Sequence, residues 1–136
     1  MTLDPRGPRF AAAVTTIVLV VTLVTASGRL ALAQAAVFAI GAANFRYAPY
    51  AVVYRRLVAP RLAPPAEREA AEPVRFAQGV GLVFALIGAG GYLLGAPVIG
   101  LVAIGLALAA AFLNAAFGFC LGCEVYLLLR RLTARA

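Results

Sequence analysis

The chain has 136 residues, of which 64% are hydrophobic and only 12% are charged. One domain is the usual expectation at this length, but a soluble domain must cover its surface with more polar groups than this. All 12 basic residues are arginines, and the net charge is +7. Nucleic-acid binding would need this charge along a soluble face with polar or aromatic readers, and the sequence has no such face. The composition therefore predicts a membrane protein without a nucleic-acid partner.

The residue types that are missing exclude several kinds of chemistry. There is no histidine, which excludes Ser-His triads and His-ligated haem or metal sites. Two cysteines are too few for a disulfide framework, and a closed zinc site needs four ligands. We therefore expect no cofactor and no metal, although two thiolates alone would suit a soft ion such as Cu(I) or Hg(II).

Four apolar stretches follow one another along the chain. A membrane-spanning helix needs about 20 apolar residues, and we predict spans at about 10–27, 30–46, 76–95 and 97–119. The second span is short, and we expect Arg29 and Arg46 to extend from its ends to the two membrane interfaces. The sequence therefore predicts an all-α integral membrane protein, a four-helix bundle that forms one domain.

The first apolar stretch also has features of a signal peptide. Arg6 and Arg9 precede it, and Ala31-Leu32-Ala33 resembles a cleavage site. Because the stretch is long and a second one follows almost at once, we expect it to stay in the protein.

The arginines predict the orientation in the membrane. They gather before the first span, in the loop 55–75 and after the last span, whereas only Arg29 lies on the other side. The positive-inside rule makes the arginine-rich side cytoplasmic. We therefore expect a multi-pass protein of a bacterial plasma membrane, with a cytoplasmic loop at 55–75 and both termini inside.

A weak internal repeat divides the chain into two halves. Arg9-Phe10-Ala11-Ala12 opens the first span as Arg75-Phe76-Ala77-Gln78 opens the third. Tyr54-Arg55-Arg56-Leu57 follows the second span as Leu129-Arg130-Arg131-Leu132 follows the fourth. This pattern predicts two helical hairpins related by a pseudo-two-fold axis along the membrane normal.

Small residues recur every four positions on the third and fourth spans. Helices in lipid associate through such residues because the backbones must approach closely. We expect contact between these two spans along the following ridges: Gly81, Ala85 and Ala89 on the third span, and Ala103, Ala107, Ala111 and Ala115 on the fourth.

A helix running from Ala96 to Leu129 would be roughly 50 Å long. The hydrocarbon core of a bilayer is only about 30 Å thick. We therefore expect a break between Gly118 and Gly122, followed by an interfacial helix at about 120–132. This prediction places Cys120 and Cys123 at the cytoplasmic boundary.

The pair Cys120 and Cys123 is the main candidate for chemistry. Helical spacing sets the two about 60° apart, with Glu124 on the same face. Such a pair can close a disulfide, and a helix starting near Gly118 would direct N–H groups at the first sulfur and favour its thiolate. Glu124 would oppose the thiolate or accept a proton, and Arg46, which the repeat aligns with this segment, would stabilise it. The alternative is that both cysteines only pack as small apolar residues.

The chain resembles a family over nearly its whole length. The motifs are Asp4-Pro5-Arg6-Gly7-Pro8-Arg9-Phe10, Pro73-Val74-Arg75-Phe76-Ala77-Gln78-Gly79 and, most specific, Leu113 to Glu124 with its segment Phe119-Cys120-Leu121-Gly122-Cys123. These resemble a family of small membrane proteins, frequent in actinobacteria, that is catalogued as a domain of unknown function. Members often occur beside thioredoxin-like or rhodanese-type proteins, and the resemblance thus implies a soluble partner of that kind.

Together these observations predict thiol-disulfide redox chemistry or persulfide relay at the cytoplasmic interface, with Cys120 as attacking and Cys123 as resolving thiol. Two alternatives stay open: a transporter or permease component for a small sulfur compound or soft metal, and a non-catalytic structural membrane subunit. The spans lack an ionisable residue at mid-membrane, which disfavours proton-coupled transport. A thiol pair without a visible cofactor site does not establish an enzyme, and nothing in the sequence indicates an oligomeric state.

Overall fold

The computed structural model describes residues 2–3, 6–63 and 69–135, and it confirms the predicted all-α class. The longer helices are α1 (Arg6–Thr25), α2 (Gly28–Ala43), α4 (Ala71–Leu93), α5 (Pro97–Phe117) and α6 (Leu121–Arg135). Between α2 and α4 lie the short helices η1 (Phe45–Tyr47), α3 (Pro49–Val53), the π-helical η2 (Tyr54–Val58) and η3 (Ala59–Arg61). One pair of two-residue strands, β1 (Thr2–Leu3) and β2 (Glu69–Ala70), is antiparallel.

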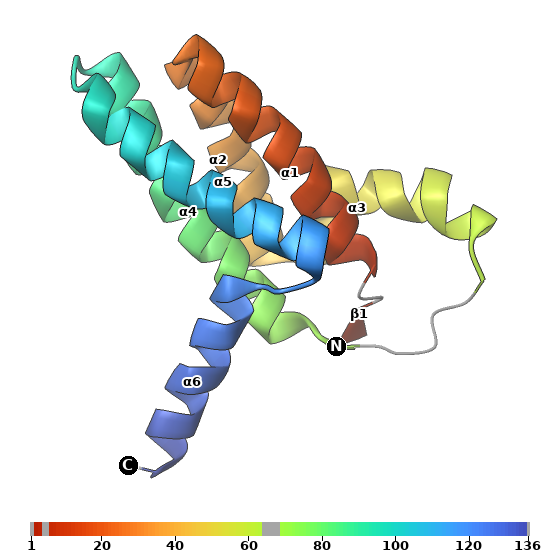
Figure 1. Cartoon of the computed structure of the whole chain (residues 1–136). Coiled ribbons are helices and arrows are strands. Elements are labelled where there is room, and N and C mark those ends of the chain that lie inside the picture. Colours follow the sequence, from red (N-terminus) through yellow and green to blue (C-terminus); the bar gives the residue numbers. More distant parts are fainter. Residues whose placement is uncertain (1, 4–5, 64–68, 136) are drawn as a thin grey trace.

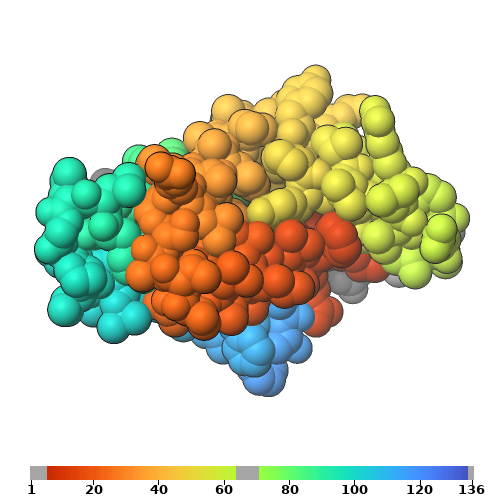
Figure 2. Space-filling model, turned by 90° about the horizontal axis from the view of Figure 1, so that it is seen from above, coloured from red at the N-terminus to blue at the C-terminus, as the bar shows by residue number. Residues whose placement is uncertain are grey.

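The helices α1, α2, α4 and α5 form the packed body of the molecule (Figure 1). The α1–α2 turn and the α4–α5 turn lie at one end of this body, whereas β1, α3 and α6 lie at the other. Figure 2 looks down from above and shows the α4–α5 turn and η3 at opposite sides of the molecule, with α1 and α2 between them. In the described part of the chain, β1, α3 and α6 therefore leave the body at the same end.

Three of these helices have the length and composition of membrane spans. They are α1, α4 and α5, while α2 is a shorter apolar helix of 16 residues. Large apolar side chains are exposed along them, such as Ile17, Val24, Val83 and Leu101. A monomeric soluble protein rarely exposes so continuous an apolar surface. These are the features of a membrane protein.

The first two helices, α1 and α2, pack mainly against helices of the second half and not against each other. The contacts of α2 are mainly with α4 and those of α1 mainly with α5, whereas α1 and α2 share few contacts although a short turn joins them. The α4–α5 pair is also closely packed. Near their turn, a methyl group added at Gly91 would stand 2.9 Å from the Cα of Gly100. The two backbones therefore touch directly, as small residues allow in helical membrane proteins.

The small-residue ridge of α4 contacts α5, as predicted, and it also contacts α2, which was not predicted. Ala89 does pack in one cluster with Ala107 of α5. Ala85 instead packs with Phe38 of α2, and a methyl group added at Gly81 would stand 2.8 Å from the same ring. The reason is steric: the large Phe38 side chain needs a hollow, and Gly81 and Ala85 form it.

The turns follow ordinary capping chemistry. The hydroxyl of Ser27 accepts the N–H of Leu30 at 3.1 Å and caps the start of α2. Gly95, with φ of 83°, ends the segment after α4, and Pro97 begins α5. Of the predicted loop 55–75, residues 55–61 continue as helical turns and α4 begins at Ala71, while residues 64–68 lie outside the described part of the chain.

The predicted break between Gly118 and Gly122 is confirmed. Helix α5 ends at Phe117, and α6 begins at Leu121. Between them Gly118 adopts φ of 68°, a left-handed conformation that glycine takes without strain. Its N–H donates to the carbonyl of Asn114, and the N–H of Phe119 donates to that of Leu113 at 3.3 Å. This pattern is typical of a glycine cap that ends a helix.

Arginine caps occur twice, each joining the two halves of the chain. Near the start of α1, Arg9 donates from Nη2 to the carbonyl of Ala115 at the end of α5, at 3.3 Å. Near the start of α4, Arg75 donates from Nε to the carbonyl of Ala42 at the end of α2, at 2.9 Å. A cation at the C-terminal end of a helix satisfies a free carbonyl and interacts favourably with the helix dipole.

An aromatic contact also occurs twice. The rings of Phe10 in α1 and Tyr54 in η2 are 5.8 Å apart, and those of Phe76 in α4 and Tyr126 in α6 are 5.7 Å apart, with similar tilts. In each half of the chain, the first helix contacts the exit helix, which is the helical segment that follows the second apolar helix: α3–η2 in the first half and α6 in the second. The exit helices α3–η2 and α6 are therefore attached to the body in the same way.

Candidate thiol site

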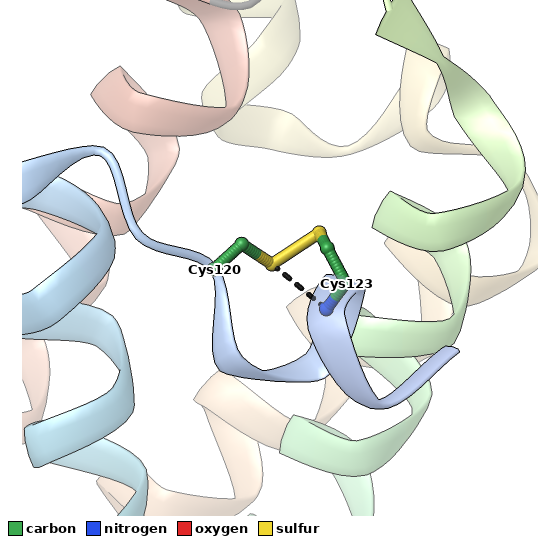
Figure 3. Close-up of a disulfide and its surroundings, with 2 residues drawn as sticks. All are labelled: Cys120 and Cys123. Carbon is green, nitrogen blue, oxygen red and sulfur yellow. Dashed lines mark hydrogen bonds between the residues drawn. A yellow bond between two sulfur atoms is a disulfide. The ribbon is translucent and has the colours of Figure 1, made fainter. Parts of the chain in front are cut away.

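Cys120 and Cys123 form a disulfide at the start of α6 (Figure 3). Their Cα atoms are 5.2 Å apart, within the usual range for a disulfide. Cys120 directly precedes α6, and its carbonyl accepts the N–H of Glu124 at 3.0 Å. The Sγ atom of Cys120 accepts the N–H of Cys123 at 3.1 Å. The first turn of α6 therefore directs a backbone donor at the first sulfur, as expected from the sequence, although α6 begins at Leu121 and not near Gly118.

Gly122 allows this turn to lie directly on α4. A methyl group added at Gly122 would stand 2.6 Å from the Cβ of Ala77 and 2.7 Å from its Cα. One helical turn further on, the Tyr126–Phe76 ring contact holds the same two helices together. The glycine between the cysteines thus has a packing reason, because any side chain there would push α6 away from α4.

The two cysteines differ in their surroundings. Both are half-buried. Cys123 packs against an apolar cluster drawn from α1, η1, α3 and α4, together with the residue before α3, and its members are Ala11, Phe45, Ala48, Ala51 and Val74. Glu124, the next residue, is exposed. The packing holds Cys123 in place, while the sulfur of Cys120 accepts a hydrogen bond from a backbone N–H.

The structure places Arg46 at the surface, on η1. Its N–H donates to Oδ1 of Asn44 at 3.1 Å, and its carbonyl accepts Nη1 of Arg55 at 2.6 Å. Phe45 and Ala48, on either side of this segment, belong to the cluster against which Cys123 packs. The η1 segment therefore lies beside the cysteine turn, and the Arg46 side chain is exposed.

Reasoning from the sequence missed Arg9. Besides its hydrogen bond to Ala115, its guanidinium lies 3.7 Å from the position that a methyl group at Gly118 would take. Gly118 precedes Cys120 by two residues. A signal existed in the repeat, where Arg9 and Arg75 open the two halves in the same Arg-Phe-Ala pattern. The repeat alone did not predict the contact of Arg9 with Ala115, because that contact depends on the pairing of α1 with α5.

An open, shallow depression lies at the start of α4, lined by Ala42, Glu72, Arg75 and Phe76. Binding sites for small molecules usually enclose most of the ligand surface, and this depression does not. In the part of the chain that the structure describes, no three His, Cys, Asp or Glu side chains lie together as metal ligands would. The disulfide does offer a reactive group, because a thiolate can attack it.

Comparison with known protein families assigns nearly the whole chain to one family. The model of a domain of unknown function, DUF4395, matches residues 3–131, from β1 into the last turns of α6. No curated protein and no solved structure matches the chain. The matched range includes the Cys120–Cys123 turn and both arginine caps. This confirms the expected membership of a family catalogued as a domain of unknown function: the chain belongs to the DUF4395 family.

Proposed function

We propose that this protein passes electrons or a persulfide sulfur between the Cys120–Cys123 pair and a soluble thioredoxin-like or rhodanese-like protein at a membrane surface. One observation carries the proposal: the disulfide lies at the start of α6, half-buried, with a backbone N–H at the sulfur of Cys120. After reduction, that N–H and the helix N-terminus favour the thiolate of Cys120, which is the reactive form.

The redox form of the reaction proceeds through a mixed disulfide. A thiolate of the partner's dithiol attacks Sγ of Cys120, the bond between the two cysteines breaks, and Cys123 leaves as a thiolate. The second partner thiolate attacks the partner sulfur of the mixed disulfide, and Cys120 leaves as a thiolate. The partner ends as a disulfide, the pair ends reduced, and the partner's two thiol protons reach the pair. Glu124, exposed beside Cys123, is the group proposed to carry a proton.

The sulfur-transfer form uses the same two roles. The thiolate of Cys120 attacks the outer sulfur of a partner persulfide, which leaves a partner thiolate and a persulfide on Cys120. The thiolate of Cys123 then attacks Sγ of Cys120, hydrosulfide leaves, and the disulfide forms again. Both forms need one attacking and one resolving thiol, so the same variants test them.

We further propose that α1, α2, α4 and α5 cross a bacterial plasma membrane with both termini in the cytoplasm. The distribution of arginine supports this orientation, because the end with the α1–α2 and α4–α5 turns holds only Arg29. The opposite end holds α6, whose exposed leucines and Arg130 and Arg131 suit a helix lying in the interface. The cysteine pair then lies where membrane meets cytosol.

Capture of the mixed disulfide tests the proposed exchange. In native membranes, Cys123→Ser lacks the resolving thiol and is expected to accumulate a mixed disulfide between Cys120 and a thioredoxin-like or rhodanese-like protein, identified by mass spectrometry after non-reducing electrophoresis. Cys120→Ser is the matched control and is expected to capture none. If both thiols of the reduced wild type fail to react with iodoacetamide in detergent and glutathione disulfide never restores the bond, the exchange function is wrong.

A second candidate, a permease component for a small sulfur compound, is favoured by the contacts that occur in both halves. The paired arginine caps and paired ring contacts support a pseudo-two-fold arrangement of two hairpins, which many transporters have. Uptake of labelled thiosulfate into proteoliposomes separates this candidate from the first. Equal uptake by empty vesicles and by vesicles with protein would contradict it.

A further inference from the structure

We infer that Arg9 is the positioning cation that stabilises the thiolate of Cys120 when the disulfide is open. This inference rests on the proposed thiol exchange and names the residue that would give Cys120 the attacking role. It assigns the stabilisation of the thiolate to a side chain on α1, the helix that packs against α5, and not to the surface residue Arg46.

The geometry around Gly118 carries the inference. The Arg9 guanidinium is held by the carbonyl of Ala115 at 3.3 Å and stands 3.7 Å from the Cβ position of Gly118. Residues two apart in a chain have Cα atoms at most about 7 Å apart. The guanidinium therefore lies within roughly 12 Å of the Cα atom of Cys120, on the order of one Debye length at physiological salt. A site at the edge of an apolar body has a lower effective dielectric than water, so the attraction persists over that distance.

Glu124, on α6 itself, opposes a thiolate at either cysteine. Helix α5 has no charged residue. Further charged groups are Glu72 and Arg75 on α4, Arg6 on α1, which donates to the carbonyl of Ala63, Arg46 on η1, and Arg130 and Arg131 further along α6. Among these cations, Arg9 is the one whose guanidinium stands against the link between α5 and Cys120.

The chain offers a matched control in Arg75. It makes the same kind of cap in the other half, on the carbonyl of Ala42, and is exposed like Arg9. On α4 it lies about 160° around the helix from Ala77, the residue on which Gly122 docks. Loss of Arg75 therefore removes a comparable cap without removing the charge beside Cys120.

The test measures the rate of iodoacetamide alkylation of Cys120 against pH in reduced, detergent-purified Cys123→Ser protein. Adding Arg9→Gln is expected to raise the pH midpoint of this rate by about half a unit, the size that a charge at this distance gives. Arg9→Lys is expected to keep most of the wild-type midpoint, and Arg75→Gln to leave it unchanged. At about 1 M salt the difference between Arg9 and Gln is expected to disappear, because the interaction is then screened.

Equal midpoints for Arg9→Gln and Arg75→Gln would overturn the inference, and so would a shift produced by Arg46→Gln alone. Either result leaves mixed-disulfide capture untouched, so failure of the inference is distinct from failure of the exchange function, in which Cys120 shows no reactivity at any pH. Thermal unfolding of Arg9→Gln and of Arg75→Gln shows whether each variant loses no more stability than the loss of one helix cap explains. A midpoint restored by Arg9→Lys excludes a general loss of structure as the cause.

Discussion

Gly122 is the residue between the two cysteines whose replacement has the clearest structural consequence. The Cβ of an alanine there would overlap the Cβ of Ala77, and neither atom belongs to a flexible side chain. Gly122→Ala is therefore expected to move α6 off α4 and to lower the free energy of unfolding by about 1–3 kcal/mol, the usual cost of overpacking. Thermal unfolding in detergent measures the loss.

Gly105→Ala is the control for this substitution. Gly105 lies inside α5, and a methyl group there meets nothing within 4 Å. Its replacement is expected to be neutral or to stabilise the protein by up to about 1 kcal/mol, because alanine has the higher helix propensity. If Gly122→Ala unfolds at the same temperature as Gly105→Ala, the direct contact between α6 and α4 is wrong.

Gln34, which is buried, and Tyr50, which is half-buried, form a polar pair. The phenol of Tyr50 donates to Oε1 of the fully buried Gln34 at 2.8 Å, while Nε2 of Gln34 has no hydrogen-bond partner in the part of the chain that the structure describes. Tyr50→Phe leaves Oε1 unpaired as well and is expected to cost about 1 kcal/mol. Gln34→Leu combined with Tyr50→Phe removes both partners and is expected to cost less than the two single changes together.

A double-mutant cycle on thermal unfolding measures this coupling, and strictly additive effects would contradict the hydrogen bond. The pH dependence gives a second readout. Burial raises the pKa of the Tyr50 phenol above its ordinary value of 10.0. The folded state therefore holds this proton more tightly, so the contribution of Tyr50 to stability is complete below pH 10 and falls as the pH rises through the raised pKa. Tyr50→Phe is expected to lack that fall.

At the scale of helices, local sequence was enough for some features and not for others. The apolar stretches predicted helices, and the length of the last one predicted the break that Gly118 makes, because both depend only on residues close in sequence. The pairing of α1 with α5 and of α2 with α4 depends on tertiary packing. A ridge such as Gly81, Ala85 and Ala89 fits any apolar neighbour, so its division between two helices was not predictable. The contact of Arg9 with Ala115 was missed for the same reason.

The end of α5 makes a prediction about Gly118. An alanine there must adopt φ of 68° or lengthen α5, and the left-handed conformation costs an L-residue roughly 1–2 kcal/mol. Gly118→Ala is therefore expected to destabilise the protein by about 1 kcal/mol, and Gly118→Asn by less, because asparagine tolerates this conformation. Thermal unfolding ranks the two. Equal stability of the alanine and asparagine variants would contradict a left-handed cap at this position.

At the scale of the whole molecule, the two halves are interlocked. Each half supplies an arginine that caps the second helix of the other half, through the Arg9–Ala115 and Arg75–Ala42 hydrogen bonds. The main helix pairs, α1 with α5 and α2 with α4, also join different halves. The cysteine turn is thus held from both sides, by Arg9 near the end of α5 and by Ala77 under Gly122. Its equivalent in the first half, the η1 segment, has no cysteine.

The proposed orientation makes a prediction that single cysteines can test in cells. In a Cys120→Ser, Cys123→Ser background, Ser27→Cys and Ala96→Cys mark the two turns at one end of the body, and Arg131→Cys marks α6 at the other. A membrane-impermeant maleimide is expected to label the turn positions in intact cells and Arg131→Cys only after permeabilisation, since arginine-rich segments stay in the cytoplasm. Labelling of Arg131→Cys in intact cells would invert the orientation. Labels on the two turns from opposite sides would mean that α2 does not cross, and the cysteine pair would then lose its cytosolic partner.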